Sequence, residues 1–320
     1  MAPSSPAVAE AVHVVDGLVA AVGTREEMLL RRSRATEVID LGRAALLPGF
    51  VEPHTHPDLC AQLYAWVDVS GFTYPDVAGV VAALQRAAAE TPAGEWIFAF
   101  GLDPMLTSDL GAWDRCRLDA ISTRHPIFVM IQSMHTAFVN SRALAIAGID
   151  ASTPDPGGGG HFGRDAAGEP TGRLEEQLAM LPFLVHMDTA GEHLRDHLRA
   201  QYVRYRDAGI TSIGVAGTFS GAAQMPIFVG VAEDAANPVR TTAYLRHPAG
   251  VRLERAPREG PRYRVRGVKL WYDGSPYTGT MLLREPYLDS ELCCCTLGIP
   301  PGTTGRANFA PDDVADALAD

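Results

Sequence analysis

The chain lacks any long apolar run, and nothing in its 320 residues approaches the roughly 18 to 20 uninterrupted apolar residues of a membrane span. The N-terminus also lacks a charged segment followed by an apolar one, the pattern of a secretory leader. From these two absences we expect a soluble, cytoplasmic protein that has no membrane partner.

Basic residues are scarce as well. The 27 Lys and Arg residues stand against 38 Asp and Glu residues, and the net charge is -11. Nucleic-acid binding needs clustered basic side chains, and the Arg-rich stretch 252–266 is interrupted by Pro, Gly and Glu. We therefore expect no nucleic-acid partner. A small molecule is the expected partner, and homo-oligomer formation is left open.

Cysteine is rare and unevenly placed, since three of the five cysteines are the neighbours Cys293, Cys294 and Cys295. Adjacent cysteines cannot easily pair with one another. The triple also lacks the C-x-x-C spacing of a structural zinc site. This pattern indicates a reducing compartment, with the triple in local packing or an incidental loop.

The composition is that of a globular protein, with 47% apolar and 20% charged residues, and the length suits one large barrel or two ordinary domains. Short strands at 11–23, around an Asp-Gly turn, and at 37–41 predict a small β-layer. Beyond residue 193, strands alternate with helices, which predicts βαβ units and a parallel sheet. The other expected elements are helices at 75–89, 174–181, 193–208 and 225–235, strands at 96–100, 127–131, 210–215, 240–245 and 265–272, a loop at 154–172 and a helix from 311.

Two histidines, His54 and His56, stand at i, i+2 spacing at the end of a short apolar run. On a strand this spacing points both rings to one face, so both can reach one divalent metal. Imidazole nitrogen suits zinc and similar metals. The alternative is a chance pair of surface histidines beside a proline turn.

Lys269 lies inside an otherwise apolar strand end, in the stretch VKLWYDGS. Burying an ammonium group there is costly unless it has a partner. The side chain can reach solvent along its stem, pair with an acid, or lose its charge as a carbamate that bridges two metals. The residues alone leave these three alternatives open.

Taken together, the motifs of the chain resemble those of the amidohydrolase superfamily, in the amidohydrolase-3 branch that includes N-substituted formamide deformylases. The resemblance runs over nearly the whole chain, and several motifs match in order. They are PGFVEPHTHP (48–57), GEWIFAFGLDP (94–104), HTAFVNSRAL (135–144), GEPTGRLEE (168–176), DAGITSI (207–213) and VKLWYDGS (268–275).

This resemblance implies a (β/α)₈ barrel with a small β-sandwich, and a metal centre at the carboxyl ends of the barrel strands. Residues 1–47 would be a partial β-sandwich segment. Residues 48–320 would be an incomplete barrel with a substrate region inserted at about 71–181. His54 and His56 would be metal ligands on the first barrel strand. Lys269, on the fourth, would be the carboxylated lysine that bridges two metals.

The implied reaction is hydrolysis of an amide or formamide C–N bond in a small molecule, with one or two divalent ions, zinc first, activating a water molecule. His135, in the inserted region, would contact the substrate and take part in catalysis, or would be a neutral core histidine. Glu176 would be a ligand, an orienting group or a helix-start acid. Asp103 and Asp273 would contact substrate, or would be turn or cap residues.

The family pattern continues with two histidines and an aspartate on later strands, whereas the last histidine here is His247. We therefore expect a fragment with about half of the barrel, which is inactive or weak, aggregation-prone or dependent on a partner chain. Three functions stay open. They are a metal-dependent hydrolase, an inactive fragment that acts as a binding or assembly module, and a metal-free α/β protein with structural histidines.

Overall fold

The fold is described from a computed structural model. It describes residues 9–108, 110, 113–157, 159–187, 191–246, 260–310 and 312–315. The chain divides into two compact units, Met1–Pro48 and Gly49–Asp320. Within the described ranges, no helix combines the length and the apolar character that crossing a bilayer requires.

The N-terminal unit holds an antiparallel hairpin of β1 (Ala11–Val15) and β2 (Leu18–Gly23), as expected, and the helix α1 (Arg25–Leu30). Thr24 caps α1 in a capping box with Glu27. The predicted strand at 37–41 is wrong, because this segment has no regular structure and leaves Ile39 71% exposed. A strand needs a partner strand for its backbone hydrogen bonds, and this segment pairs with none of the described strands.

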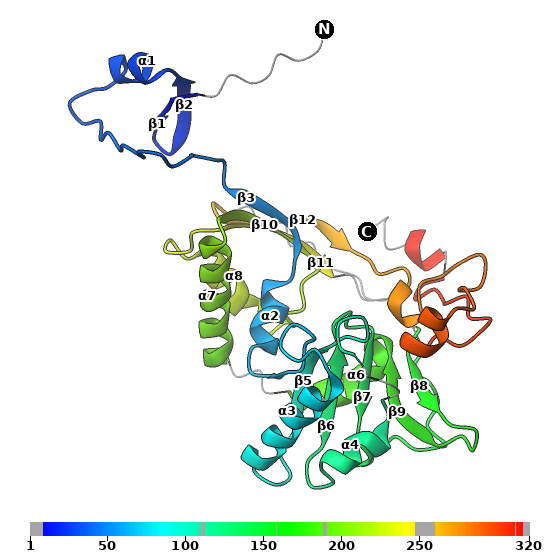
Figure 1. Cartoon of the computed structure of the whole chain (residues 1–320). Coiled ribbons are helices and arrows are strands. Elements are labelled where there is room, and N and C mark those ends of the chain that lie inside the picture. The colour runs from blue at the N-terminus through cyan, green and yellow to red at the C-terminus, as the bar shows by residue number, and fades with distance from the viewer. Residues whose placement is uncertain are drawn as a thin grey trace. The chain divides into compact units, whose positions relative to one another are not determined.

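The larger unit contains a four-stranded parallel sheet in the order β12-β11-β10-β3 (Figure 1). Its strands follow one another in the chain as β3 (Phe50–Thr55), β10 (Ile210–Ala216), β11 (Arg240–Arg246) and β12 (Tyr263–Lys269). This is the arrangement expected of the first four strands of a barrel. β3 is an edge strand, since β10 is its only partner among the described residues.

Three helices cover one face of this sheet, α2 (Pro57–Leu63), α7 (Gly191–Asp207) and α8 (Met225–Glu233). Alternate residues of β10 and β11, among them Ile213, Val215 and Ala243, point to the helices and are buried with Tyr202 and Phe228. Successive side chains of a strand point to opposite sides of the sheet. Tyr244, next to Ala243 on β11, and His54 on β3 therefore lie on the face opposite the helices.

A second sheet, with the strand order β4-β5-β6-β7-β9-β8, fills the chain between β3 and β10. The inserted region that we expected at about 71–181 is therefore a folded layer with its own sheet. Its elements are β4 (Val67–Asp68), α3 (Val77–Glu90), β5 (Ile97–Leu102), α4 (Arg115–Ile121), β6 (Ile127–Ile131), β7 (Thr136–Val139), α5 (Ser141–Ala147), β8 (His161–Arg164), β9 (Pro170–Glu175) and α6 (Glu176–Leu184).

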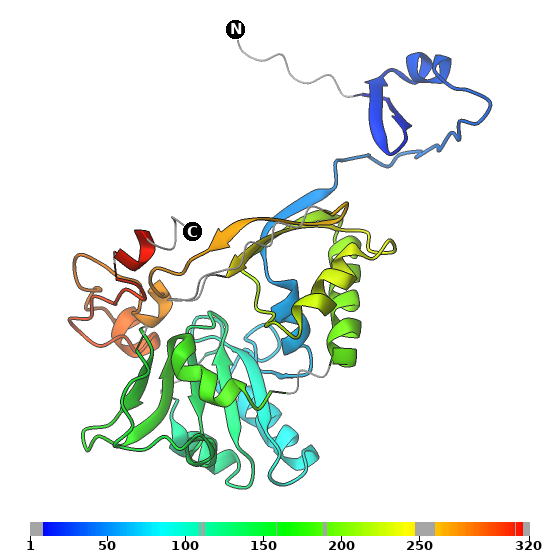
Figure 2. The same ribbon diagram turned by 180° about the vertical axis from the view of Figure 1, so that it is seen from behind.

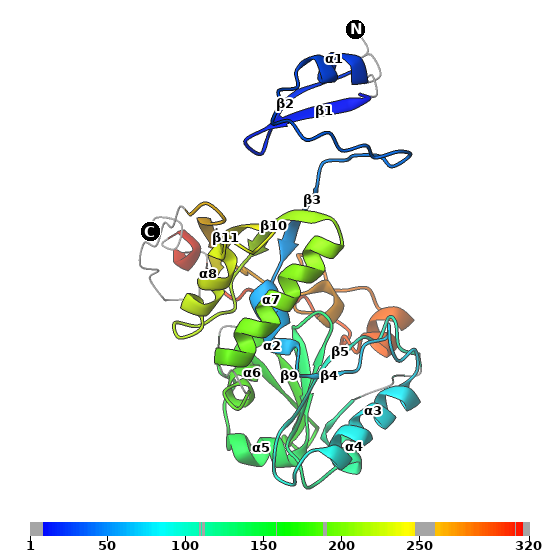
Figure 3. The same cartoon turned by 90° about the vertical axis from the view of Figure 1, so that its left-hand side faces the viewer.

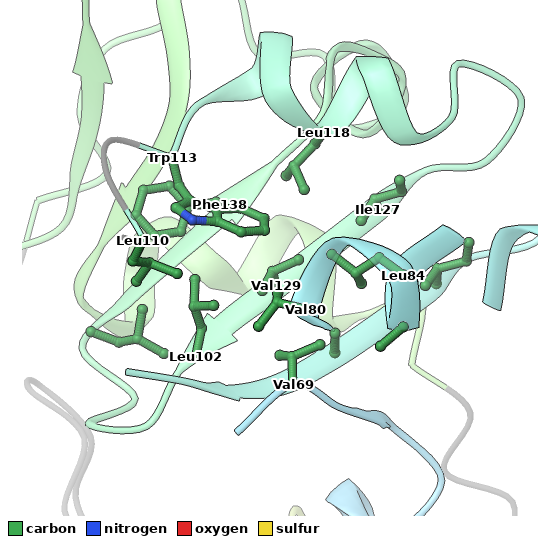
Figure 4. Close-up of a cluster of buried hydrophobic side chains, with 14 of the residues drawn as sticks. Val69, Val80, Leu84, Leu102, Leu110, Trp113, Leu118, Ile127, Val129 and Phe138 are labelled. Carbon is green, nitrogen blue, oxygen red and sulfur yellow. The ribbon is translucent and has the colours of Figure 1, made fainter. Parts of the chain in front are cut away.

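Both faces of this second sheet are buried. Figure 3 shows α3 and α4 on one side of it and α5 and α6 on the other. Every residue of β6 is buried, with Ile127 and Val129 in the cluster under α3 and α4 (Figure 4) and Phe128 in the cluster under α5 and α6. A run of apolar residues without alternation is typical of a strand covered on both faces.

Two predictions for this region are wrong. The segment 154–172, expected as a loop, contains β8 and the start of β9, which pair as antiparallel strands. The helix expected from Leu174 begins only at Glu176, because β9 continues through Glu175. Glycine and proline have a low strand propensity, which is why the sequence predicted a loop here. The pairing of β9 with β7 and β8 outweighs that propensity.

The chain after β12 lies beside β8 and β9 in both views of Figures 1 and 2. The guanidinium of Arg306 donates to the carboxylate of Glu175 on β9 at 2.9 Å. This segment contains the short helices η1 (Pro276–Thr278) and η2 (Leu292–Thr296), and η2 has π-helical hydrogen bonding. All five cysteines are free, and in η2 the Sγ atoms of Cys294 and Cys295 lie 3.0 Å apart.

Candidate metal centre

The two predicted histidine ligands lie together at the carboxyl end of β3. His54 is in the strand, and His56 is the N-cap residue of α2. Their ring centroids are 5.4 Å apart and the rings meet edge to face. His54 is exposed and His56 is half-buried. The spacing in the sequence therefore does bring both imidazoles to one place.

The ring of His56 is held in one orientation by the backbone that follows β10. Its Nδ1 lies 2.9 Å from the carbonyl oxygen of Gly217. Because a carbonyl oxygen can only accept, Nδ1 carries the proton and Nε2 keeps its lone pair. Histidines that bind metals commonly donate their other ring N–H to a carbonyl in this way. His56 therefore has the orientation and tautomer of a metal ligand.

Gly217 also brings Lys269 close to this site. It has a φ of +109°, which favours glycine, and a Cβ atom at this position would lie 3.1 Å from Cγ of Lys269. The stem of Lys269, at the end of β12, thus packs against the residue whose carbonyl holds His56. The three predicted ligands, His54, His56 and Lys269, all lie at the carboxyl ends of strands of the parallel sheet.

Burial lowers the pKa of His56 from 6.5, and the nearby charges of His54 and Lys269 lower it further. The hydrogen bond to Gly217 and the charge of Asp58 raise it, but by less. The neutral ring, which is the form that binds metal, therefore persists below pH 6.5. We expect the metal-free protein to show a His56 midpoint below 6.5 in an NMR titration, with the resonance assigned through the His56→Asn variant. A midpoint at or above 6.5 would contradict this burial.

The same shift makes the stability depend on pH. As the pH falls below 6.5, the unfolded chain takes up a proton at this position before the folded chain does. The contribution of His56 to stability is therefore present above pH 6.5 and is lost as the pH falls toward its lower folded pKa.

Asp58, which the sequence analysis does not single out, is fully buried two residues after His56. Its Oδ2 accepts the backbone N–H groups of Phe219 at 2.6 Å and Ser220 at 2.7 Å. Burial raises the pKa of this carboxyl, and the hydrogen bonds oppose that effect. The ring of Phe219 meets His56 edge to face at 5.1 Å. Asp58 thus fixes the loop that packs against His56.

His135 and Glu176, both predicted as site residues, form a pair. Nδ1 of His135 donates to the carboxylate of Glu176, with Oε2 at 3.0 Å, and Glu176 is buried. Glu176 has a φ of +62°, and its N–H donates to the carbonyl of His135. A left-handed conformation is strained for a residue other than glycine. This position therefore holds its carboxylate through backbone and side-chain bonds to one histidine.

The pair lies close to the loop that follows Lys269. A Cβ atom on Gly274 would lie 2.4 Å from Oε1 of Glu176, so only a glycine leaves room for this carboxylate. The inserted region thus supplies a carboxylate to the loop after β12. Of the three alternatives for Glu176, the geometry matches that of a group that orients His135.

The two predicted substrate aspartates make local contacts. The carboxylate of Asp103 accepts the N–H of Met105 at 2.7 Å, in the turn after β5. The carboxylate of Asp273 accepts the N–H of Leu282 at 2.9 Å. Asp103 thus has the contact of a turn residue, one of the alternatives that the sequence left open. Asp273 instead holds the backbone of a residue well beyond a turn.

The described part of the chain holds no group of three or more His, Cys, Asp or Glu residues placed to bind a metal. The side chains that come together here are the imidazoles of His54 and His56 and the lysine Lys269. Imidazole nitrogen is a ligand of metals such as zinc, and the hydrogen bond to Gly217 leaves Nε2 of His56 available as a ligand atom. Asp58, Gly217 and Phe219 were missed from the sequence because their roles come from contacts across about 160 residues of chain.

A family model with the description "Amidohydrolase family" matches residues 37–320. The chain is 30% identical over 210 residues to N-substituted formamide deformylase of Arthrobacter pascens, covering 64% of this chain and 39% of that protein. It is 29% identical over 286 residues to the putative amidohydrolase YtcJ of Bacillus subtilis (strain 168), covering 88% and 53%. The chain thus spans about half the length of these relatives or less.

Among solved structures, an uncharacterized metal-dependent hydrolase from Pyrococcus horikoshii OT3 is similar in fold, with a TM-score of 0.61 and 20% sequence identity. The alignment covers 96% of this chain and 58% of that one. An uncharacterized metal-dependent hydrolase from Pyrococcus furiosus gives a TM-score of 0.58, also at 20% identity. The arrangement of the sheets and helices is therefore shared with known metal-dependent hydrolase structures.

Proposed function

The chain belongs to the amidohydrolase family, and on this basis we propose that it takes part in hydrolysis of an amide or formamide C–N bond in a small molecule, using a bound divalent cation. The observation that carries the proposal is the orientation of His56, whose Nδ1–H donates to Gly217 at the carboxyl edge of a parallel sheet. Active sites of barrels form at this edge.

His54, His56 and Lys269 would hold the cation, for which zinc is our candidate. When bound, the cation would supply Lewis acidity, which polarises a carbonyl group and lowers the pKa of a water molecule. Gly217 keeps Nε2 of His56 available as a ligand atom. If Lys269 is a carbamate, it would bridge two ions.

His135 and Glu176 would act on the substrate side. The carboxylate of Glu176 fixes the protonated Nδ1 of His135 at 3.0 Å, so Nε2 is left as an acceptor. In this tautomer His135 can accept a proton or a hydrogen bond from the substrate. Glu176 would then be a positioning residue.

The test is turnover by the full chain supplied with zinc, using N-butylformamide and measuring the formate released. We expect formate release that a chelator abolishes and that returned zinc restores. A His56→Asn variant is the matched control and should stay inactive with zinc present. Turnover that survives the chelator would contradict the proposal.

A second candidate is a half-barrel that acts as an assembly module. It is favoured by the exposure of Phe50 (60%) and Val51 (65%) on the edge strand β3. This candidate predicts self-association in size-exclusion chromatography without formate release at any zinc concentration. Turnover by the monomer would exclude it.

A further inference from the structure

Arg246 lies at the carboxyl end of β11, and its register partner across the sheet is Lys269 on β12. Adjacent strands are about 4.8 Å apart. Arg246 therefore lies at the same carboxyl end of the sheet as the candidate metal ligands. No motif in the sequence points to this arginine.

Two aromatic rings pack against the guanidinium. Its Cζ atom is 5.4 Å from the ring centroid of Phe219 and 5.8 Å from that of Trp271, and these rings are 5.6 Å apart. Because the two rings are about as close to each other as each is to Cζ, they lie on one side of the guanidinium and do not enclose it. Phe219 is the residue that also packs against His56.

Among the described residues, most N–H groups of this guanidinium have no acceptor. Nη1 donates to Oε1 of Gln177 at 2.8 Å, whereas a guanidinium has five N–H donors. Within the described residues, no Asp or Glu forms an ion pair with Arg246. The charge of Asp58 acts on Arg246, but Oδ2 of Asp58 already accepts two backbone N–H groups. Burial lowers the pKa of Arg246, opposed by the charge of Asp58, so this cation has lost water without gaining an ion pair.

We propose that Arg246 binds a carboxylate of the substrate, so that the substrates are amide or formamide compounds that carry a carboxylate group. This inference rests on the proposed function. A planar carboxylate matches the paired N–H donors of a guanidinium. The charge of Asp58 within electrostatic range favours a group with one negative charge over a phosphate dianion. Phe219 and Trp271 provide apolar walls for the carbon skeleton.

The first experiment measures binding by the full chain kept in chelator, so that no metal can hold the probe. ¹⁹F NMR titrations compare 4-fluorobenzoate with the neutral 4-fluorobenzamide. We expect the wild type to bind the benzoate about tenfold more tightly, as one charged hydrogen-bonded pair allows. Arg246→Met should remove this preference, and Arg246→Lys should restore only part of it, since lysine lacks the paired geometry.

The matched control is Arg264→Met. Arg264 is exposed on the neighbouring strand β12 and donates to Thr242. This variant should keep the full preference, and thermal unfolding checks that each variant is folded. The proposal is overturned if the wild type binds both probes equally, or if Arg246→Met keeps the preference.

A second experiment separates this proposal from the proposed function. The zinc-loaded chain is supplied with N-formylglycine or N-formylglycinamide, and formate release is measured. Faster release from N-formylglycine, lost in Arg246→Met, supports both proposals. Equal release from both compounds, unchanged in Arg246→Met, overturns the carboxylate proposal alone. No release from either, with the benzoate preference intact, overturns hydrolysis and leaves Arg246 as an anion site.

Discussion

Replacing His56 by asparagine is expected to weaken zinc binding by at least about 100-fold. Loss of an outer hydrogen-bond partner alone costs 10 to about 100-fold in metal affinity, and this substitution removes the ligand atom itself. It also removes the ring that Gly217 orients at 2.9 Å. His54→Asn should give a loss of the same kind, and the double variant should bind no zinc measurably.

The measurement is zinc competition against a chromophoric chelator, with the full chain near neutral pH. His186→Asn is the matched control, because His186 is exposed and stacks on Trp96 outside the candidate site. It should bind zinc as the wild type does. Equal zinc affinities for wild type, His54→Asn and His56→Asn would remove the basis of the metal-centre proposal.

Replacing Asp58 by alanine is expected to lower the free energy of unfolding by about 2–4 kcal/mol, because two N–H groups at the turn after β10 lose their acceptor. Those donors, on Phe219 and Ser220, are 2.6 and 2.7 Å from Oδ2. The loop that holds Phe219 against His56 should loosen with them. Urea unfolding followed by tryptophan fluorescence measures this change.

Asp58→Asn is the control that keeps an acceptor oxygen, and we expect it to change stability by less than about 1 kcal/mol at neutral pH. It also tests the charge. Because burial raises the pKa of Asp58 above 3.8, the folded chain keeps this proton to higher pH than the unfolded chain. Stability then falls as the pH rises from 3.8 through the folded pKa. Asp58→Asn should lack this fall. Equal destabilisation by alanine and asparagine would show that the hydrogen bonds are not responsible.

The sequence predicts those parts of the fold that depend on local pattern. The parallel strands from Ile210 onward and the helix near Val77 follow from spacing within one element. His54 and His56 lie close together because they are two residues apart, although the strand ends at Thr55, between them. The membership of the amidohydrolase family is confirmed. The strand β8 was missed because its sequence, HFGR, is short and lies among glycines, and it exists through pairing with β9.

The contacts of Asp58 and Arg246 could not be predicted in the same way. In the sequence, Asp58 has the position of an ordinary acidic residue in the first turn of a helix. Its hydrogen-bond partners, Phe219 and Ser220, are more than 160 residues away. Arg246 reads as the exposed end of a strand, whereas its environment is made by Phe219, Trp271 and Gln177 from three other segments. Only the folded sheet edge brings these side chains together.

Because β3 is an edge strand, the strand that carries His54 should open more readily than the central strands. Among the described strands, β3 pairs with β10 alone, so fewer hydrogen bonds hold its backbone than hold the central strands β10 and β11. Its amide protons should therefore exchange with deuterium sooner than those of β10, in openings that displace His54. An ion bound to His54 would slow that exchange, because the strand could open only after His54 released the ion.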